Sequence, residues 1–361
     1  MTEAAMPALS AAAAMPITLG GAALWPPVFL APMAGITDLP FRRAVARHGG
    51  AGLMVSEMVA STEMATPRPS SRAAARAEVE ATGGGAVSVQ IAGREAAPMA
   101  ETARIVAGMG ARIIDINMGC PARKVTGGLS GAALMRDLDH ALRLIDAVIG
   151  AVPGLPVTLK MRLGWDEDCL NAPMLAARAA EAGVQMVTVH GRTRAQFYAG
   201  RADWSRIGPV AEMLRGEGRP PLVANGDVTC AASAWAALDA SGARAVMVGR
   251  GAQGAPWRLA QIASALCGTP APEVPRGAAL ADAVATHYED ILSFYGRDLG
   301  VRVARKHLGW WANAANIPHA RAALVAATSP AETLEVIASR FADAPGDDGA
   351  DASGASEAEA A

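Results

Sequence analysis

The chain has 361 residues, of which 52% are hydrophobic and 4% aromatic, and its formal net charge is -2 at pH 7. This composition predicts a soluble globular protein with one large and one smaller domain, and argues against an aromatic-rich β-sandwich. A net charge so near zero gives no overall sign of a nucleic-acid partner. The charge is uneven, however. Residues 343–361 carry six acidic and no basic side chains, so the remainder holds 32 basic against 28 acidic side chains, or +4.

The cysteines and the two ends of the chain carry few signals of their own. The four cysteines are widely spaced, without a CxxC pair or a histidine cluster, which predicts neither a metal site nor a disulfide framework and suits a reducing, cytoplasmic location. The alanine-rich start lacks the basic residues of a signal peptide. Residues 1–25 are expected to form a flexible leader. No apolar run reaches the ~20 residues of a membrane helix. Residues 344–361 are expected to be an acidic, disordered tail.

Eight short apolar segments, separated mostly by helical patterns, predict the fold. The expected strands cover residues 28–33, 52–58, 86–91, 112–117, 156–162, 184–190, 221–225 and 244–248. Helices are expected at 95–109, 131–149, 172–182 and 231–240, together with a helix after residue 36 that Thr37 would cap. Residues 61–85 are less regular. Eight such units match an α/β fold of the (β/α)8 TIM-barrel type, of ~250 residues, over residues 26–262.

A doubly wound open sheet is the competing architecture, but its phosphate-binding glycine loop would follow the first strand. Here the glycine-rich turns come late, at Asn225-Gly226-Asp227 and at Gly249-Arg250-Gly251. After the barrel, residues 263–276 are rich in proline and predict a linker. Residues 277–343 then show only helical patterns, which indicates a small all-helical domain.

Polar residues on the predicted strands point to a ligand site. Strands of a parallel barrel are buried on both faces, and buried polar groups are costly unless they find partners. Yet polar residues alternate toward the carboxyl ends of four strands, which carry Ser88 and Gln90, Asp115 and Asn117, Thr158, Lys160 and Arg162, and Thr188 and His190. These groups either satisfy one another or face a polar ligand at the barrel mouth. We favour the ligand, because four strands share the pattern at one end.

The individual residues suggest what that ligand is. Lys160 could pair with Asp115, or stabilise a ligand that becomes anionic, such as the N1/C2=O edge of a reduced flavin. His190 and Gln90 lie at the same end, and an amide can bond both a donor and an acceptor of a flavin ring. The two late glycine turns, with Arg250, follow strands seven and eight, where this barrel commonly binds phosphate.

Cys120 lies in the turn Met118-Gly119-Cys120-Pro121, just past the carboxyl end of a predicted strand, where barrel enzymes place reactive groups. An ordinary thiol, of pKa ~8.5, is mostly protonated at neutral pH and can donate a proton. Nearby Arg123 and Lys124 could instead lower that pKa and favour the thiolate.

In their order along the chain, seven motifs resemble the tRNA-dihydrouridine synthase family, in particular its bacterial B-type branch. They are Ala31-Pro32-Met33-Ala34-Gly35, Val89-Gln90-Ile91-Ala92-Gly93, Asp115-Ile116-Asn117-Met118-Gly119-Cys120-Pro121, Thr158-Leu159-Lys160-Met161-Arg162, His190-Gly191-Arg192-Thr193, Asn225-Gly226-Asp227 and Gly249-Arg250. They span residues 30 to 260. Each motif alone is weak, but the ordered set is specific.

The resemblance implies an FMN-dependent oxidoreductase that reduces particular uridines of tRNA, with NADPH or NADH as electron donor. It implies hydride transfer from flavin N5 to C6 of the uracil, and a proton from Cys120 to C5. The FMN-binding residues would be Pro32, Met33, Ala34, Gln90, Lys160, His190, Asn225, Gly226, Asp227, Gly249 and Arg250. Residues that would hold the substrate are Asn117, Arg192, Arg123 and Lys124.

The resemblance also places a tRNA-binding domain after the barrel, which agrees with the predicted helices. Arg302, Arg305 and Lys306 share one helix face by their spacing, and would bind the RNA backbone. The uridine must leave its stack to react. A monomer without a stable protein partner is expected. Two other functions stay open: an FMN barrel that acts on a free pyrimidine or enone, and a non-catalytic, FMN-containing RNA-binding or regulatory protein.

Overall fold

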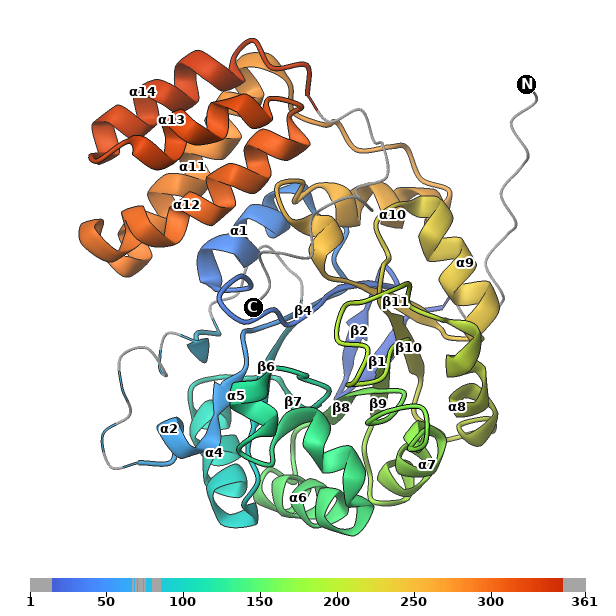
Figure 1. Ribbon diagram of the computed structural model, residues 1–361. Helices are drawn as coiled ribbons and strands as arrows, with labels where there is room; N and C mark the ends of the chain where they lie inside the picture. The colour runs from blue at the N-terminus through green and yellow to red at the C-terminus, as the bar shows by residue number, and fades with distance from the viewer. Residues whose placement is uncertain are drawn as a thin grey trace, which may run out of the picture.

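Residues 15–66, 68, 70, 74, 76–79 and 86–346 are described by the computed structural model, and they form a closed parallel barrel with a helical unit beside it (Figure 1). The barrel order is β4-β3-β11-β10-β9-β8-β7-β6, and the pairing of β4 with β6 closes it. Its strands are β3 Val28–Leu30, β4 Leu53–Val55, β6 Ala86–Ala92, β7 Ile113–Met118, β8 Val157–Arg162, β9 Met186–His190, β10 Leu222–Asn225 and β11 Ala245–Val248. The predicted (β/α)8 barrel is confirmed, and the predicted strand ends differ from the observed ones by at most three residues.

The helices that follow the strands surround the barrel (Figure 1). They are α1 Leu39–His48, α4 Ala96–Gly108, α6 Leu138–Ala151, α7 Ala172–Glu181, α8 Gly208–Met213, α9 Ala231–Ser241 and α10 Arg258–Cys267. Short elements fill the loops: β5 Val59–Ala60, α2 Ser61–Met64, α5 Arg123–Thr126, η1 Gly131–Arg136, η2 Ser205–Ile207 and η3 Arg250–Ala252. The apolar faces of the barrel helices pack against the strands, since one buried cluster combines β3, β6, β7, β8 and β9 with residues of α4, α6 and α7.

Three predicted helix boundaries are wrong. The Asp38 carboxylate, not Thr37, caps α1 by accepting from the Phe41 amide at 3.0 Å, while the Thr37 hydroxyl closes a turn with the Met33 amide. The helix expected at 131–149 is interrupted because Asp137 caps a new start by accepting from the His140 amide at 2.9 Å. The last barrel helix, α10, continues to Cys267, five residues into the predicted linker.

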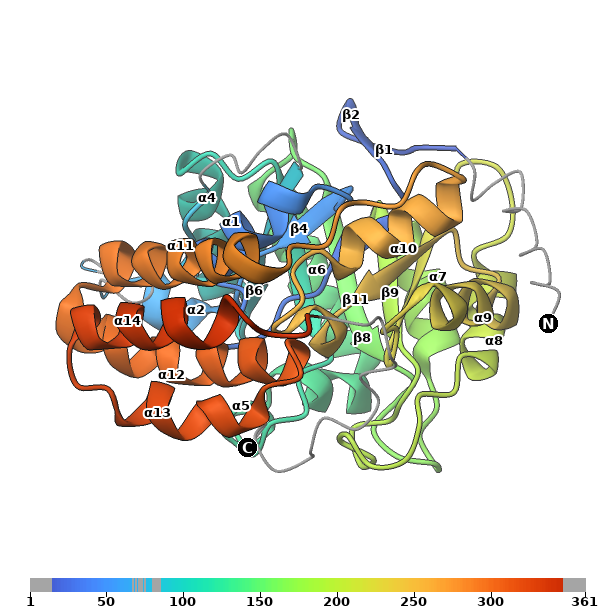
Figure 2. The ribbon, with the colours of Figure 1, turned by 90° about the horizontal axis from the view of Figure 1, so that it is seen from above.

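Residues 15–25 also differ from the flexible leader that was expected, and residues 1–14 lie outside the described part of the chain. An antiparallel hairpin forms from β1 Ile17–Leu19 and β2 Ala22–Leu24. Its buried side chains join a cluster with barrel residues such as Phe29, Ile113 and Met247. The hairpin therefore closes one end of the barrel, and Figure 2 shows it on the side away from α5. The signal for this hairpin is a short alternation of buried and exposed side chains, which hydrophobicity averaged over a long window does not reveal.

The carboxyl-terminal helices have a core of their own. They are α11 Gly277–Tyr295, α12 Arg297–Ala314, α13 Arg321–Ala326 and α14 Pro330–Phe341, with η4 Pro318–Ala320 between α12 and α13. Trp257, which precedes α10, packs into this core against Trp311, and α11 lies against α1 (Figures 1 and 2). Ala344 is still buried in this core, so the predicted tail is packed at its start. Residues 347–361 of that tail lie outside the described residues.

No helix in the part of the chain that the structure describes is long and apolar enough to cross a membrane.

The hairpin contribution to stability can be measured with two substitutions. Leu24 is fully buried, so Leu24→Ala is expected to reduce the free energy of unfolding by about 3 kcal/mol through lost burial and a residual cavity. Thr18→Ser, on the exposed face of the hairpin, is the matched control and should stay within about 0.5 kcal/mol. Chemical denaturation measures both. Equal stabilities for the two variants would mean that the hairpin does not complete the core.

Candidate active site at the barrel mouth

Four of the polar side chains predicted on the strand faces form a hydrogen-bonded chain inside the barrel mouth. The Thr158 hydroxyl donates to Asp115 Oδ1 at 2.6 Å, and Gln90 Nε2 donates to Asp115 Oδ2 at 2.7 Å. Asn117 Nδ2 then donates to Gln90 Oε1 at 2.7 Å. The parallel pairing of β6, β7 and β8 brings these residues together, because Asp115 on β7 lies opposite Gln90 on β6 and Thr158 on β8.

Lys160 lies above this chain and does not form its ion pair with Asp115. Its ammonium donates to Asn225 Oδ1 at 2.8 Å, and Asn225 donates in turn to the Met247 carbonyl at 2.8 Å. Burial and the neighbouring Arg162 lower the pKa of Lys160 to about 8, although Asp115 opposes the shift. Burial raises the pKa of Asp115. Lys160 is therefore still mostly a cation at pH 7, and it donates a hydrogen bond to the neutral amide of Asn225.

Asn117 holds the cysteine turn in place. Its Oδ1 accepts from the Gly119 amide at 3.1 Å and from the Cys120 amide at 2.9 Å. Its Nδ2 also donates to Gln90 and the residue is only 8% exposed, so Asn117 supports the turn, whereas its expected contact with the substrate stays a prediction. It is a positioning residue, because the side chain fixes the backbone on both sides of the Gly119–Cys120 bond.

Arg162 fixes the other side of the same turn, a role that the sequence interpretation missed. Its Nε donates to the Gly119 carbonyl at 2.8 Å, and its NH1 donates to the Thr193 and Phe197 carbonyls at 2.9 Å. Burial lowers the pKa of Arg162 to about 10, so the group stays charged at neutral pH. The position of Arg162 at the polar end of β8 indicated a functional role. Only the fold shows that its hydrogen-bond partners lie in the turn after β7 and in the loop after β9.

Burial raises the pKa of the Cys120 thiol. A hydrogen bond from the Ala122 amide and the charges of Arg162 and Lys160 act in the opposite direction but do not overcome burial. Of the two alternatives, the geometry therefore favours the protonated thiol at neutral pH. Arg123 and Lys124 lie exposed on α5 and are not among the groups that shift this pKa.

Asp227 organises two arginines beside the barrel mouth. It accepts from Arg192 at 2.9 and 2.7 Å, from Arg250 at 3.1 Å and from the Ala202 amide at 2.8 Å. Burial opposes ionisation, but the hydrogen bonds from Arg192 and Ala202 hold the pKa of Asp227 below its ordinary value. An ionised carboxylate repels a phosphate group, so Asp227 is unsuited to direct contact with a phosphate, and it orients Arg250 instead.

Arg192 is 1% exposed, and each of its guanidinium nitrogens has a partner. Besides Asp227, it donates to the Ala199 carbonyl at 3.2 Å and to the Gly200 carbonyl at 2.6 Å. A substrate contact, as the resemblance implied, would require these bonds to break. The adjacent His190 keeps partial exposure. Burial and the surrounding positive charges lower its pKa well below the usual value, so the ring is neutral at pH 7.

Exposure divides the expected cofactor residues into two layers. Gln90 and Asn225 are buried, and they hydrogen-bond other residues of the site. Partial or full exposure remains at Pro32, Met33, Ala34, Lys160, His190, Gly249 and Arg250. The exposed layer fits FMN chemically, because it offers a cation with spare N–H groups for the flavin ring edge and an arginine beside a glycine turn for the phosphate. A Cβ on Gly226 would lie 2.7 Å from the His190 ring, so only glycine lets that turn approach the histidine.

Helix α12 separates the three basic residues that the sequence grouped together. Arg302 and Arg305 are exposed, whereas the Lys306 ammonium is half-buried and donates to the Gly35 carbonyl, next to the expected FMN-binding segment 32–34. Tyr295, at the end of α11, donates to Asp38 at 2.8 Å. Lys306 therefore joins the helical unit to the barrel, and we expect it to contribute less to RNA binding than Arg302 and Arg305.

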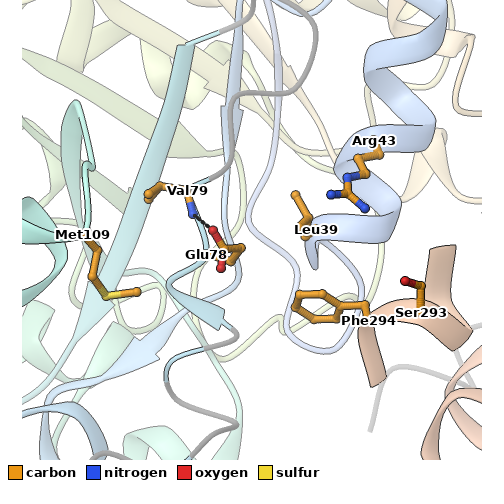
Figure 3. Close-up of a pocket in the computed structure, with 7 residues that line it drawn as sticks. All are labelled: Leu39, Arg43, Glu78, Val79, Met109, Ser293 and Phe294. Carbon is orange, nitrogen blue, oxygen red and sulfur yellow. Dashed lines mark hydrogen bonds between the residues drawn. The ribbon is translucent and has the colours of Figure 1, made fainter. Parts of the chain in front are cut away.

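A cavity of about 540 Å³ lies elsewhere, between α1, α11 and the chain before β6 (Figure 3). Its lining includes Arg43, Glu78 and Phe294, and it contains none of the expected site residues. Leu39 and Phe294 face it from the barrel helix and the helical unit (Figure 3). Because no group expected to react lies there, the strand ends around Cys120 are the stronger candidate for the active site.

Comparison with known proteins gives consistent matches. A family model described as dihydrouridine synthase matches residues 29–344. A probable tRNA-dihydrouridine synthase of Rhodobacter capsulatus is 67% identical over 329 residues, which cover 91% of this chain and 99% of that protein. The tRNA-dihydrouridine synthase B of Xanthomonas axonopodis pv. citri is 44% identical, over 81% of this chain and 86% of that protein. Among solved structures, morphinone reductase in complex with tetrahydroNAD shares the fold, with a TM-score of 0.50 at 15% identity over 72% of this chain and 93% of that chain.

The protonation state of Cys120 can be tested by alkylation. Because burial raises the thiol pKa, its reaction with iodoacetamide should increase with pH only above the ordinary thiol range of ~8.5. Lys160→Met removes a charge that lowers this pKa and should shift the midpoint further upward. Lys124→Met, at an exposed position outside this set, is the control and should leave it unchanged. Mass spectrometry of the peptide that contains Cys120 provides the rate. A midpoint below the ordinary value would contradict the protonated thiol.

Proposed function

The chain belongs to the dihydrouridine synthase family, and from that premise we propose that it reduces the C5=C6 bond of particular uridines in tRNA. FMN is the proposed cofactor, and NADPH or NADH the proposed electron donor. One observation carries the proposal. The thiol of Cys120 lies at the carboxyl end of a barrel strand and is partly exposed. Burial raises its pKa, and the charges of the nearby cations Lys160 and Arg162 act in the opposite direction. That arrangement suits proton donation to a carbon that becomes electron-rich.

We assign the cofactor to the exposed layer of the mouth. When bound, FMN supplies the hydride for C6 of the uracil. Lys160 would hold the pyrimidine edge of the flavin, His190 would bind beside it, and Arg250 with the Gly249 turn would bind the phosphate. Asn225 supports Lys160 and Asp227 supports Arg250, since each accepts a hydrogen bond from that cation. Gln90 bonds Asp115 and Asn117 deeper in the mouth.

Cys120 supplies the proton for C5. Its raised pKa keeps the proton on Sγ until C5 acquires negative charge. The thiolate left behind is stabilised by the Ala122 amide and by the charges of Arg162 and Lys160, which are the groups that oppose the pKa shift in the resting state. Asn117 and Arg162 hold the turn in one conformation, so that Sγ is already in position before the reaction.

The helical unit is the proposed site for the body of the tRNA. Arg302 and Arg305 are exposed on α12, and α12 is tied to the barrel through Lys306. RNA bound there can present a flipped uridine to the barrel mouth, at a distance that the docking of the two units fixes. Both tRNA and NAD(P)H occur in the cytoplasm, which is where we place the reaction. The monomeric state expected from the sequence stays a prediction.

Removal of the thiol should separate the two half-reactions. Cys120→Ala is expected to lower the rate of uridine reduction roughly a hundredfold or more, because the proton donor is lost. NADPH should still bleach the flavin absorbance at the normal rate in the absence of tRNA. Anaerobic stopped-flow absorbance measures the flavin steps, and mass spectrometry of nucleosides measures dihydrouridine. Full uridine reduction by the variant would refute the role of Cys120, and wild-type protein that never reduces uridine would refute the function.

The basic residues of α12 should differ in their effect on RNA binding. Replacement of both Arg302 and Arg305 by alanine should weaken tRNA binding and reduce the slope of log affinity against log salt by about 0.7 to 0.9 per lost phosphate contact. Lys306→Met should leave this slope unchanged and instead lower the melting temperature, because its contact is with Gly35. Filter binding at several salt concentrations distinguishes them. A smaller slope for the Lys306 variant would show that this side chain does reach the RNA.

A further inference from the structure

Three neighbouring loops at the barrel mouth bring two arginines against one tryptophan. Arg136 ends η1 after β7, Trp165 follows β8, and Arg194 follows β9. The guanidinium carbon of Arg136 lies 5.0 Å from the centroid of the Trp165 ring, and that of Arg194 lies 4.6 Å from it. Both distances are within the range of cation–π contacts. We call Arg136, Trp165 and Arg194 the arginine clamp.

The clamp is held rigidly by its backbone. The Arg194 amide donates to the Gly164 carbonyl at 3.0 Å, and the Ala195 amide donates to the Trp165 carbonyl at 2.8 Å, so two backbone hydrogen bonds join the loops after β8 and β9 at the tryptophan. At the start of η1, the Ala132 amide donates to the Cys120 carbonyl at 3.0 Å. The helix that carries Arg136 is therefore attached directly to the reactive turn.

The charges of the clamp are not neutralised. Neither Arg136 nor Arg194 forms an ion pair with a carboxylate among the residues that the structure describes. By contrast, Arg206, on the same rim, binds Glu167 of the Trp165 loop at 2.6 Å. Two guanidinium groups against one indole repel each other, so an anion that binds both relieves the repulsion. Arg194 NH2 donates to the Thr126 hydroxyl at 3.4 Å, which is a neutral partner, and its buried Nε has no hydrogen-bond partner.

We propose that the arginine clamp binds the RNA phosphodiester next to the uridine that is reduced, an inference that rests on the proposed function. A planar guanidinium group can bind two phosphate oxygens at once, and contact with the Trp165 ring restricts the orientation of each arginine. The α12 arginines lie on the helical unit, whereas the clamp belongs to the same three loops that position Cys120. It is therefore placed to hold the backbone of a nucleotide that has left its stack.

The test compares three clamp variants with a matched control on the same rim. Arg136→Ala and Arg194→Ala should each weaken tRNA binding about tenfold and reduce the salt slope by about 0.7 to 0.9. Trp165→Leu should weaken binding although it removes no charge, because the guanidinium groups lose their support, and Trp165→Phe should restore it. Arg206→Ala, whose partner is Glu167, should stay within twofold of wild type.

Two readouts separate this inference from the proposed function. Flavin absorbance and the rate of its reduction by NADPH without tRNA should be unchanged in every clamp variant, which also verifies folding. If the wild type reduces uridine but Arg136→Ala and Arg194→Ala bind tRNA as the wild type does, the clamp is refuted and the function stands. If the variants instead raise the KM for NADPH without affecting tRNA binding, the phosphates of the nicotinamide coenzyme are the ligand, and the RNA assignment is overturned.

Discussion

The hydrogen bonds of Asp115, buried between Gln90 and Thr158, are the constraint on which the barrel mouth depends. The interior of a parallel barrel is otherwise apolar, so a carboxyl group there needs partners on both neighbouring strands. Those partners fix the Gln90 amide, and Gln90 in turn fixes Asn117, whose Oδ1 holds the cysteine turn. The position of the Cys120 thiol thus depends, through four hydrogen-bonded side chains, on the register of three strands.

Positive charge at the mouth is used in two distinct ways. Arg162 and Arg192 are almost fully buried and bind carbonyl groups or Asp227, so they act as structural supports for the loops. Lys160 and Arg250 stay partly exposed and have capacity for a ligand. The same division recurs on α12, where Lys306 joins the two units while Arg302 and Arg305 face solvent. A basic residue in a motif can therefore bind a ligand only where it is exposed enough for its N–H groups to be available.

Close backbone approach fixes how the helical unit sits on the barrel. Gly254, after β11, has no side chain, and a Cβ there would lie 2.2 Å from the Trp310 carbonyl of α12. Its φ of +71° also favours glycine. On the other side of the same helix, Lys306 reaches Gly35, beside the expected FMN-binding segment. Two barrel loops thus hold α12 directly, which links the proposed RNA-binding surface to the proposed cofactor site.

The sequence by itself determined the barrel, because hydrophobic periodicity and the turn after each strand are local properties of the chain. It also identified the strand end that carries Cys120 and the polar faces of β6, β7, β8 and β9. It did not identify the hairpin at residues 17–24, whose short alternation was hidden in an alanine-rich leader.

Only the tertiary structure decided the roles of individual polar residues. Whether Lys160 pairs with Asp115 or Asn225, whether Arg192 is buried, and whether Arg136 and Arg194 meet at Trp165 all depend on which strands are neighbours. Hydrogen-bond partners in this barrel lie tens of residues apart in sequence, and the burial that shifts a pKa is a property of the whole assembly. For that physical reason, the motifs located the site, and the fold assigned its parts.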